Sequence, residues 1–253
     1  NDGWFKDGKY WKNAHQRCHL DTFTLSCERR KEGKREMIKS VKLSFKVLVN
    51  VDPEDETPDL SEVWFNTTYT VYPDATVKVE NEFLPVYYHA EREMSVPRIG
   101  QLFKLKGALE TVDWYGRGPW ENYADRKTSA LVGRYRMLVK ELAYAYVRPQ
   151  ENGYRTDVRE LTLSSPEGNG MKVTGLPFFC FNAQYAPKEN YEINGKPIRN
   201  TIDLKHEKDV FLNIDYGQMG VGGDNSWGNP VHVDYRVLLR NYRYGYVIQL
   251  FKE

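Results

Sequence analysis

The chain has 253 residues, and 36 Lys and Arg against 35 Asp and Glu leave a net charge of +1. This balance argues against a nucleic-acid partner, because a nucleic-acid-binding face is basic and raises the net charge. No apolar run approaches the roughly 20 residues that cross a bilayer, so we expect no membrane segment. The odd set of Cys18, Cys27 and Cys180 excludes a full disulfide framework. One disulfide stays open, as does the compartment, cytoplasm or periplasm.

An alternation of apolar and polar residues predicts strands in the first third of the chain. These strands span residues 41–49, 64–72 and 76–83. An acidic turn with two prolines at 52–59 follows the first strand, and Pro73-Asp74 turns the chain before the last one. The segment therefore predicts a series of antiparallel hairpins.

The second half of the chain continues in the same way. Further strands are predicted over 161–163, 171–173, 231–239 and 244–251. The sequence P-E-G-N-G at 166–170 predicts a hairpin turn, and residues 200–208 are the best candidate for a helix. Strands at short spacing indicate an all-β protein built as an antiparallel sandwich. Because no repeat or long polar linker divides the chain, we predict one domain over residues 1–253.

Common catalytic and metal-binding motifs are absent from the sequence. It contains no G-x-S-x-G, no P-loop, no H-E-x-x-H and no paired C-x-x-C. His15, Cys18, His19 and Cys27 have the residue types of a metal cluster, but their spacing matches no zinc site well. The sequence therefore predicts no metal site in this chain.

Two glutamates are candidates for acid–base chemistry. Glu121 and Glu151 each precede an Asn, in W-E-N-Y and Q-E-N-G, within polar segments that also contain Pro and Gly. A glycosidase needs two carboxylates on either side of one bond, and nothing in this spacing places them so. We predict instead a structural polar network, in which these carboxylates cap backbone N–H groups or pair with Arg126 and Arg155. Catalysis by the two glutamates is the alternative.

A glycine-rich loop is the most informative segment. Four glycines lie between positions 217 and 223, and Asp224, Asn225, Ser226 and Trp227 follow them. A Trp on such a polar loop is poorly placed for a core and well placed as a flat platform for a sugar face or a partner surface. The alternative is that Trp227 folds back into the sandwich.

Four segments together resemble the C-terminal, small-chain domain of family 2 β-galactosidases. They are V-P-R-I-G at 96–100, D-W-Y-G-R-G-P-W-E-N-Y-A-D-R at 113–126, Y-V-R-P-Q-E-N-G-Y-R-T-D-V-R-E-L at 146–161 and M-G-V-G-G-D-N-S-W at 219–227. They occur in the order seen in that family, and the resemblance runs from about residue 1 to the end. It implies an antiparallel β-supersandwich like that of galactose mutarotase.

The resemblance also implies which functions lie outside this chain. In the family, the catalytic acid and nucleophile are both Glu and belong to a TIM-barrel domain, which this chain lacks. Glu121 and Glu151 match motif positions of the family but not its catalytic pair. The magnesium and sodium sites of the family lie mainly in the missing part, so no cofactor is expected here. The implied partners are a β-galactoside, the catalytic TIM-barrel domain or large subunit, and further copies in an oligomer.

The resemblance assigns one functional residue and shows one departure. Trp227 matches a Trp that reaches into the family's active site beside the sugar, with Asp224 and Asn225 as candidate polar contacts. The segment Asn1–Trp4 resembles D-N-D-x-G, which in the family lies well inside this domain. The opening strands of the sandwich would then be missing, and a sheet edge would be exposed.

The resemblance thus implies a non-catalytic domain that completes the galactoside-binding pocket of a separate catalytic domain. The full enzyme would hydrolyse terminal β-D-galactosides with retention. One alternative is a mutarotase-like aldose epimerase, which needs a positioned acid–base pair, whereas the five histidines lie in no recognisable motif. The other alternative is a free-standing carbohydrate-binding module.

Overall fold

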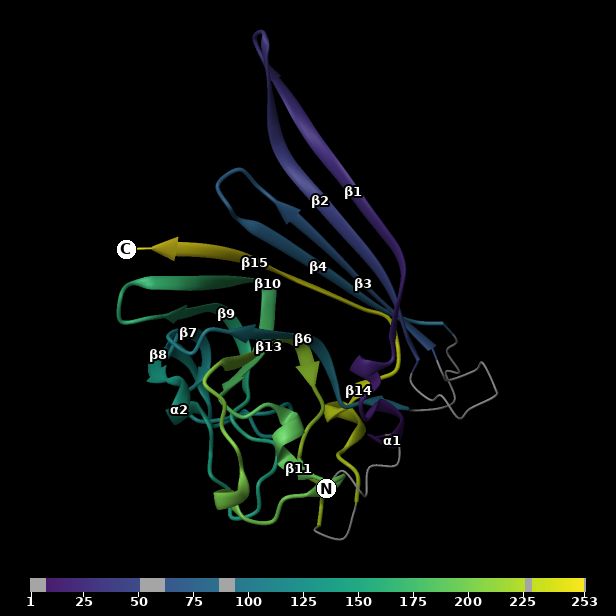
Figure 1. Ribbon diagram of the computed structural model, residues 1–253. Helices are drawn as coiled ribbons and strands as arrows, with labels where there is room; N and C mark the ends of the chain where they lie inside the picture. The colour runs from purple at the N-terminus through teal and green to yellow at the C-terminus, as the bar shows by residue number, and fades with distance from the viewer. Residues whose placement is uncertain (1–7, 51–61, 87–93, 226–228, 253) are drawn as a thin grey trace. The chain divides into compact units, whose positions relative to one another are not determined.

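The computed structural model describes residues 8–50, 62–86, 94–225 and 229–252 (Figure 1). Antiparallel strands dominate, joined by turns and short helical segments, so the all-β prediction is confirmed. The chain divides into two compact units that are interleaved in sequence. Unit 1 comprises residues 1–99 and 218–249, and unit 2 comprises residues 100–217 and 250–253. The single domain over 1–253 stays a prediction.

Unit 1 is built on a sheet of long strands. Its strands, in sheet order, are β1 Cys18–Glu32, β2 Arg35–Asn50, β3 Glu62–Val71, β4 Val77–Pro85 and β15 Tyr242–Lys252, of which residues 242–248 pair with β4. A small second sheet pairs β5 Ser95–Val96 with β14 Val237–Leu238. The helical segments are α1 Gly8–Trp11, η1 Ala14–Gln16 and η4 Val233–Tyr235.

The predicted strands of the first third are confirmed as β2, β3 and β4. The acidic turn predicted at 52–59 lies outside the described residues. Aromatic side chains form part of the packing, with the Trp11 and Tyr242 rings each within about 6.2 Å of the Phe83 ring. Such ring contacts between α1, β4 and β15 stabilise the sheet beyond the area that they bury.

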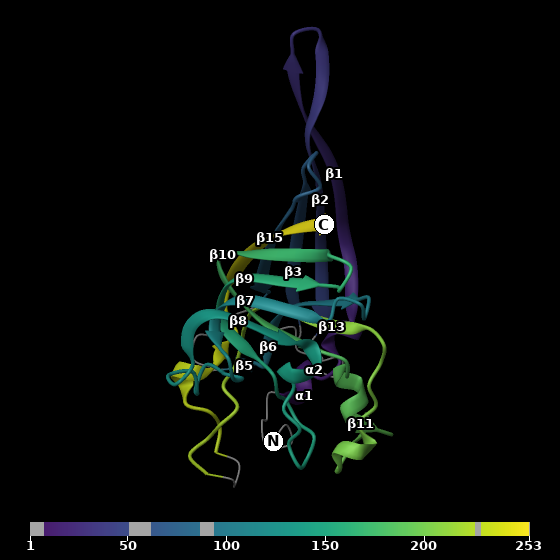
Figure 2. The same ribbon diagram turned by 90° about the vertical axis from the view of Figure 1, so that its left-hand side faces the viewer.

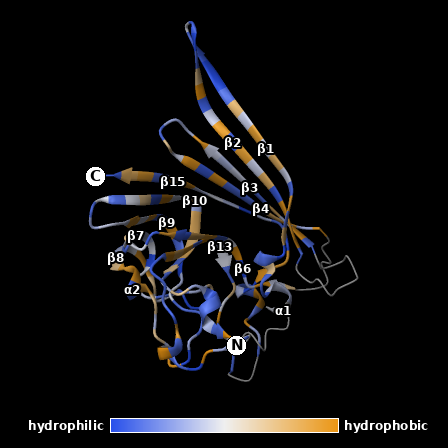
Figure 3. Ribbon diagram, in the orientation of Figure 1, coloured by the Kyte–Doolittle hydropathy of each residue, from blue (hydrophilic) through white to orange (hydrophobic). Residues whose placement is uncertain are grey.

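The first strand, β1, is exposed along its whole length. It forms a hairpin with β2 and lies at the edge of the sheet among the described strands. Figure 3 shows hydrophobic and hydrophilic residues alternating along both strands. Leu20, Phe23 and Leu25 are between 49% and 63% exposed. The expected exposed edge is therefore present, while the missing opening strands stay a prediction.

Two sequence predictions were wrong. The strand predicted over 231–239 is paired only at β14, because the N–H groups of Tyr235 and Arg236 donate instead to the carbonyls of His232 and Val233 in a 3₁₀ turn. The helix predicted over 200–208 shrinks to a 3₁₀ turn, Thr201–Asp203. Its residues are exposed, so no buried apolar face stabilises a longer helix.

Unit 2 contains a second set of antiparallel strands. Its strands are β6 Arg98–Leu105, which starts in unit 1, β7 Thr111–Gly118, β8 Leu131–Leu138, β9 Arg155–Ser164, β10 Asn169–Gln184 and β13 Val210–Gln218. Figure 2 shows β10, β9, β7 and β8 side by side in this order, and β13 pairs with both β10 and β6. The remaining elements are α2 Val139–Leu142, η2 Lys188–Tyr191, β11 Glu192–Ile193, β12 Lys196–Pro197 and η3 Thr201–Asp203.

The core of unit 2 follows the alternation of its strands. Inward residues of β9, β10 and β13, such as Leu161, Phe181 and Leu212, are fully buried. The predicted hairpin is confirmed as β9–β10, and the Ser165 N–H closes its turn by donating to the Asn169 carbonyl at 2.8 Å. Among the described residues, no helix is long and apolar enough to span a membrane.

Candidate functional site

The glycine-rich loop starts from a fixed base in unit 1. The Arg98 guanidinium donates to the side-chain oxygen of Gln218, with its Nε at 2.9 Å. The Met219 N–H donates to the Pro97 carbonyl at 3.0 Å. Because these bonds hold the first residues of the loop against the β5–β6 segment, the position from which the loop departs is well defined.

A glycine is required at one point of this loop. A Cβ at Gly223 would come within 2.3 Å of the Asn229 carbonyl oxygen, so only glycine allows this approach. Gly223 and Asn229, which flank residues 224–228, therefore lie close together.

Two of the predicted binding residues, Asp224 and Asn225, directly follow Gly223 in the chain. Asp224 and Asn225 are exposed, and Trp227 lies outside the described residues, so its projection into solvent stays a prediction. The Asp224 Oδ1 and the Nε2 of His232 are 2.7 Å apart, and both side chains are more than 60% exposed. An exposed carboxylate held in this way offers acceptor oxygens to sugar hydroxyl groups.

Sequence analysis missed His232 as a partner of Asp224. It placed this histidine within the strand predicted over 231–239, whereas a 3₁₀ turn follows His232 and its imidazole contacts Asp224. The sequence shows only that Asp224 and His232 are polar residues near a glycine-rich loop, and that pattern alone does not predict a contact between them.

The network around Glu121 connects three loop segments in unit 2. Its carboxylate accepts hydrogen bonds from the Arg126 guanidinium at 2.5 Å, from the Tyr146 hydroxyl, and from the Gly153 N–H at 2.7 Å. The Glu121 side chain is only 13% exposed. Burial and the Glu121 carboxylate together raise the pKa of Tyr146. Three donors occupy this carboxylate, which favours a structural role.

Arg155 lies beneath these segments and is almost fully buried. It donates to the carbonyls of Leu142, Gly153 and Pro119 at 2.8–2.9 Å. Burial lowers the pKa of Arg155 to about 10, although the nearby charge of Glu121 acts in the opposite direction. The sequence analysis expected a carboxylate partner, but the guanidinium binds backbone carbonyls of three different segments.

Glu151 lies at the margin of the network. Its carboxylate is exposed, and the Tyr123 hydroxyl and the Asn182 amide approach it only to 3.4 Å. Hydrogen bonds at this distance are weak. Of the four predicted network residues, the structure therefore brings Glu121, Arg126 and Arg155 together around shared segments, and leaves Glu151 at the edge.

The residue after each glutamate is the more deeply buried one. Asn122 accepts from both the N–H and the hydroxyl of Thr156, at 3.0 and 2.6 Å. Asn152 accepts from the Tyr144 N–H at 3.0 Å. Sequence analysis treated these amides only as neighbours of glutamates. The repeated Glu-Asn pair was the signal, since an Asn beside Pro and Gly commonly binds backbone groups.

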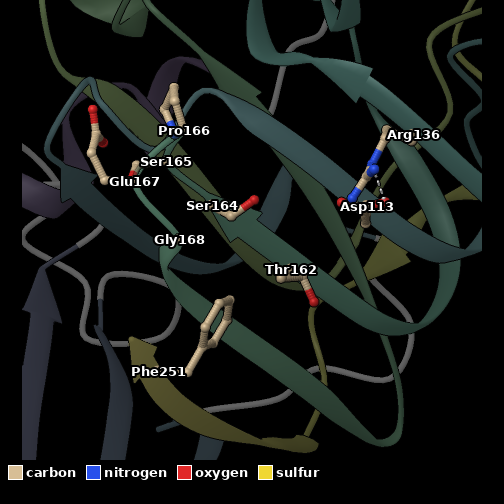
Figure 4. A pocket seen from close by; sticks show the side chains of 9 residues that line it. All are labelled: Asp113, Arg136, Thr162, Ser164, Ser165, Pro166, Glu167, Gly168 and Phe251. Carbon is tan, nitrogen blue, oxygen red and sulfur yellow. Dashed lines mark hydrogen bonds and ion pairs between the residues drawn. The ribbon is translucent and has the colours of Figure 1, made fainter. Parts of the chain in front are cut away.

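A cavity of about 450 Å³ opens elsewhere in unit 2, at the β9–β10 turn (Figure 4). Its lining residues are Asp113, Arg136, Thr162, Ser164, Ser165, Pro166, Glu167, Gly168 and Phe251. Asp113 and Arg136 form an ion pair at 2.7 Å, with the Arg136 side chain 73% exposed. A pair this exposed is well solvated and contributes little binding energy. None of the predicted site residues lines this cavity.

Metal-binding residues do not cluster within the part of the chain that the structure describes. No group of three or more His, Cys, Asp or Glu side chains gathers there in a way that would hold an ion. Cys18 and Cys27 are exposed on β1, and these two and Cys180 are free thiols. The absence of a metal site in the whole chain stays a prediction.

Comparisons with known proteins agree on one family. The family model described as "Beta galactosidase small chain" matches residues 1–248. The β-galactosidase of Priestia megaterium is 39% identical over 168 residues, which cover 66% of this chain and 16% of that protein. The β-galactosidase of Halalkalibacterium halodurans is 35% identical over 169 residues, with the same coverage of each chain. That of Alteromonas mediterranea is 31% identical over 218 residues, 79% of this chain and 20% of that protein.

The matched segment is a small part of each relative. The chain spans between 16% and 20% of the length of these relatives. Among solved structures, an aldose epimerase homologue from C. elegans is similar over 89% of this chain and 68% of that one, at 14% identity and a TM-score of 0.35. Because this likeness is too low to argue from, the fold assignment rests on the antiparallel strands themselves.

Proposed function

Because the chain belongs to the β-galactosidase small-chain family, we propose that it completes the galactoside-binding pocket of a catalytic domain or large subunit outside this chain. The match over residues 1–248 carries this proposal. Relatives named β-galactosidase are five to six times as long as the matched segment, so most of each enzyme lies elsewhere. The complete protein hydrolyses terminal β-D-galactosides.

The chemistry belongs to the larger part in this proposal. Two carboxylates in a TIM-barrel domain, roughly 5–5.5 Å apart, perform a double displacement that retains the anomeric configuration. Magnesium and sodium ions, where the enzyme uses them, bind mainly in that part. The small chain contributes binding groups rather than the catalytic acid or nucleophile. The three donors around Glu121 support this division, because they leave that carboxylate little freedom to exchange protons.

The sugar contact is assigned to the glycine-rich loop. Trp227 stacks on the apolar face of the pyranose, and Asp224 and Asn225 bind hydroxyl groups at its edge. The fixed base at Met219 and the close approach at Gly223 support this assignment, since a platform must be held in place to orient a ligand. His232 orients the Asp224 carboxylate from the other side of the loop.

A hydrolysis assay tests the division of roles. The 253-residue chain alone should release no product from a chromogenic β-galactoside above the buffer rate, whereas the complete enzyme should hydrolyse it. Proton NMR of the first sugar released by the complete enzyme should show the β-anomer. Turnover by the isolated chain that Glu121→Gln or Glu151→Gln abolishes would overturn the proposal.

The two alternatives are not favoured. A free-standing carbohydrate-binding module and an aldose epimerase would not be expected to match a β-galactosidase small chain over 248 residues. The pair of His232 and Asp224 does not favour an epimerase, because both side chains are more than 60% exposed and neither lines the cavity in unit 2.

A further inference from the structure

Three large side chains on unit 2 are unusually exposed. Trp120, Tyr144 and Val147 have 74%, 61% and 93% of their surface in solvent. Here they are called the aromatic patch. We propose that the aromatic patch is the surface on which the remaining part of the β-galactosidase binds this chain. The inference rests on the proposed function in one respect, that this chain works together with a larger part.

The patch residues come from two neighbouring segments. Trp120 directly precedes Glu121, whose carboxylate accepts a hydrogen bond from the Tyr146 hydroxyl. The rings of Tyr144 and Tyr146 lie 4.6 Å apart, and Val147 follows in the chain. The Glu121–Tyr146 bond therefore holds the segment around Trp120 beside the segment that carries Tyr144 and Val147.

Buried polar side chains hydrogen-bond to the backbone of both segments. Arg155 donates to the carbonyl of Pro119, the residue before Trp120, and to that of Leu142, two residues before Tyr144. The Tyr144 N–H donates to the buried Asn152 side chain. A surface that is already ordered loses less conformational entropy on binding. The buried Arg155 guanidinium therefore fixes the backbone beside the exposed apolar side chains of both segments.

The composition of the patch and its rim is that of a protein interface. Trp, Tyr and Arg are the residue types that dominate binding energy between proteins, with polar residues around them. Arg126 is 46% exposed beside the patch, and Arg148 and Gln150 are exposed in the segment after Val147. Covering the apolar side chains removes their surface from water, which favours binding.

The occupant follows from the size of the relatives. This chain matches at most about a fifth of each β-galactosidase compared above, so at least four-fifths of those proteins lies outside it. A sugar is a poorer candidate, because sugar sites are concave with convergent polar groups, and the cavity found in unit 2 is lined by other residues. A second copy of this chain would bury the patch too, and the test below separates the two.

Photo-cross-linking in the complete enzyme tests the proposal. Trp120→p-benzoylphenylalanine and, separately, Tyr144→p-benzoylphenylalanine are irradiated, digested and analysed by mass spectrometry. Both should cross-link to peptides from outside these 253 residues. Ile202→p-benzoylphenylalanine is the matched control, since Ile202 is 91% exposed in the same unit but lies in the η3 turn. Its yield should be at least ten-fold lower.

Three results would overturn the proposal. They are cross-links only within the 253 residues, cross-links between two copies of this chain, and a yield at positions 120 and 144 no higher than at 202. The readout does not depend on sugar hydrolysis. A complete protein that hydrolyses galactosides without these cross-links contradicts only the interface, whereas a complete protein without hydrolysis contradicts the proposed function.

Discussion

Asp157 shows how a single side chain can hold a loop against a strand. Its backbone has a φ of 54°, in the left-handed region, and its carboxylate binds Arg117 at 2.6 Å and Lys127 at 3.1 Å. Burial raises the pKa of Asp157, but the hydrogen bonds from Arg117 and Lys127 outweigh this and hold it below its ordinary value of 3.8. The charged carboxylate is therefore more stable in the folded chain than in the unfolded one.

This difference in pKa predicts an acid-sensitive contribution to stability. Because the folded-state pKa is lowered, the charged carboxylate stabilises the fold at pH values above the unfolded-state pKa. This contribution is lost as the pH falls through the folded-state pKa, which lies below 3.8. Asp157→Asn keeps the left-handed backbone accessible and removes the charge. We expect it to lower stability at pH 7 by about 1 kcal/mol. The difference in stability between the parent and Asp157→Asn, measured by urea denaturation, should shrink as the pH falls below about 3.8. Parallel pH profiles would contradict this account.

At the scale of elements, the approach of β7 to β9 depends on one glycine. A Cβ at Gly116 would come within 2.8 Å of the Val158 Cα and 3.2 Å of the Asp157 carbonyl oxygen. These are backbone atoms, so the strands would have to separate. Gly116→Ala should therefore lower the free energy of unfolding by about 1–3 kcal/mol.

Gly217 in β13 is the matched control for this substitution. A Cβ there meets nothing within 4 Å, and its φ is not in the left-handed region. Gly217→Ala should leave the melting temperature unchanged or slightly higher, because alanine restricts the unfolded chain. Equal melting temperatures for Gly116→Ala and the parent would show that the two strands separate without cost.

Most of the strands that sequence analysis predicted correctly have a hairpin partner next to them in the chain; the strand predicted over 244–251 is the exception, since β15 pairs with the distant β4. Residues 41–49 alternate and pair with β3, and the 161–173 segment closes on its own turn. Residues 231–239 alternate equally well, but only Val237–Leu238 finds a partner strand. Periodicity reports which face is apolar, whereas pairing depends on distant residues that a local pattern does not contain.

The sequence pointed to residues of the polar network but not to their geometry. Glu121, Arg126 and Arg155, which lie near Pro and Gly in the sequence, all bind neighbouring groups in the structure. The carbonyls that Arg155 binds are 2, 13 and 36 residues away, and no pattern in the sequence connects them. The contact between Asp224 and His232 was missed because it depends on a 3₁₀ turn within residues 231–239, whose alternation predicts a strand.

On the scale of the whole molecule, we propose that the chain is a supporting part of a larger enzyme. Its family assignment extends over almost every residue, while the segment that matches covers at most a fifth of each β-galactosidase compared above. The proposed account gives it two surfaces in different units, a glycine-rich loop for the sugar and an aromatic patch for the larger part. In this proposal neither surface supplies a catalytic carboxylate, so losing either should weaken binding or assembly before it affects the chemical step.

The most direct test of this account is the kinetics of Trp227→Ala in the complete enzyme. If Trp227 stacks equally on the ground state and the transition state, KM for a β-galactoside should rise about ten-fold, the equivalent of about 1.4 kcal/mol, while kcat stays within about two-fold. Ile202→Ala, an equally simple truncation of an exposed apolar residue, should have parental kinetics. Parental KM and kcat for Trp227→Ala, or a loss confined to kcat, would contradict the claim that this chain completes the sugar-binding pocket.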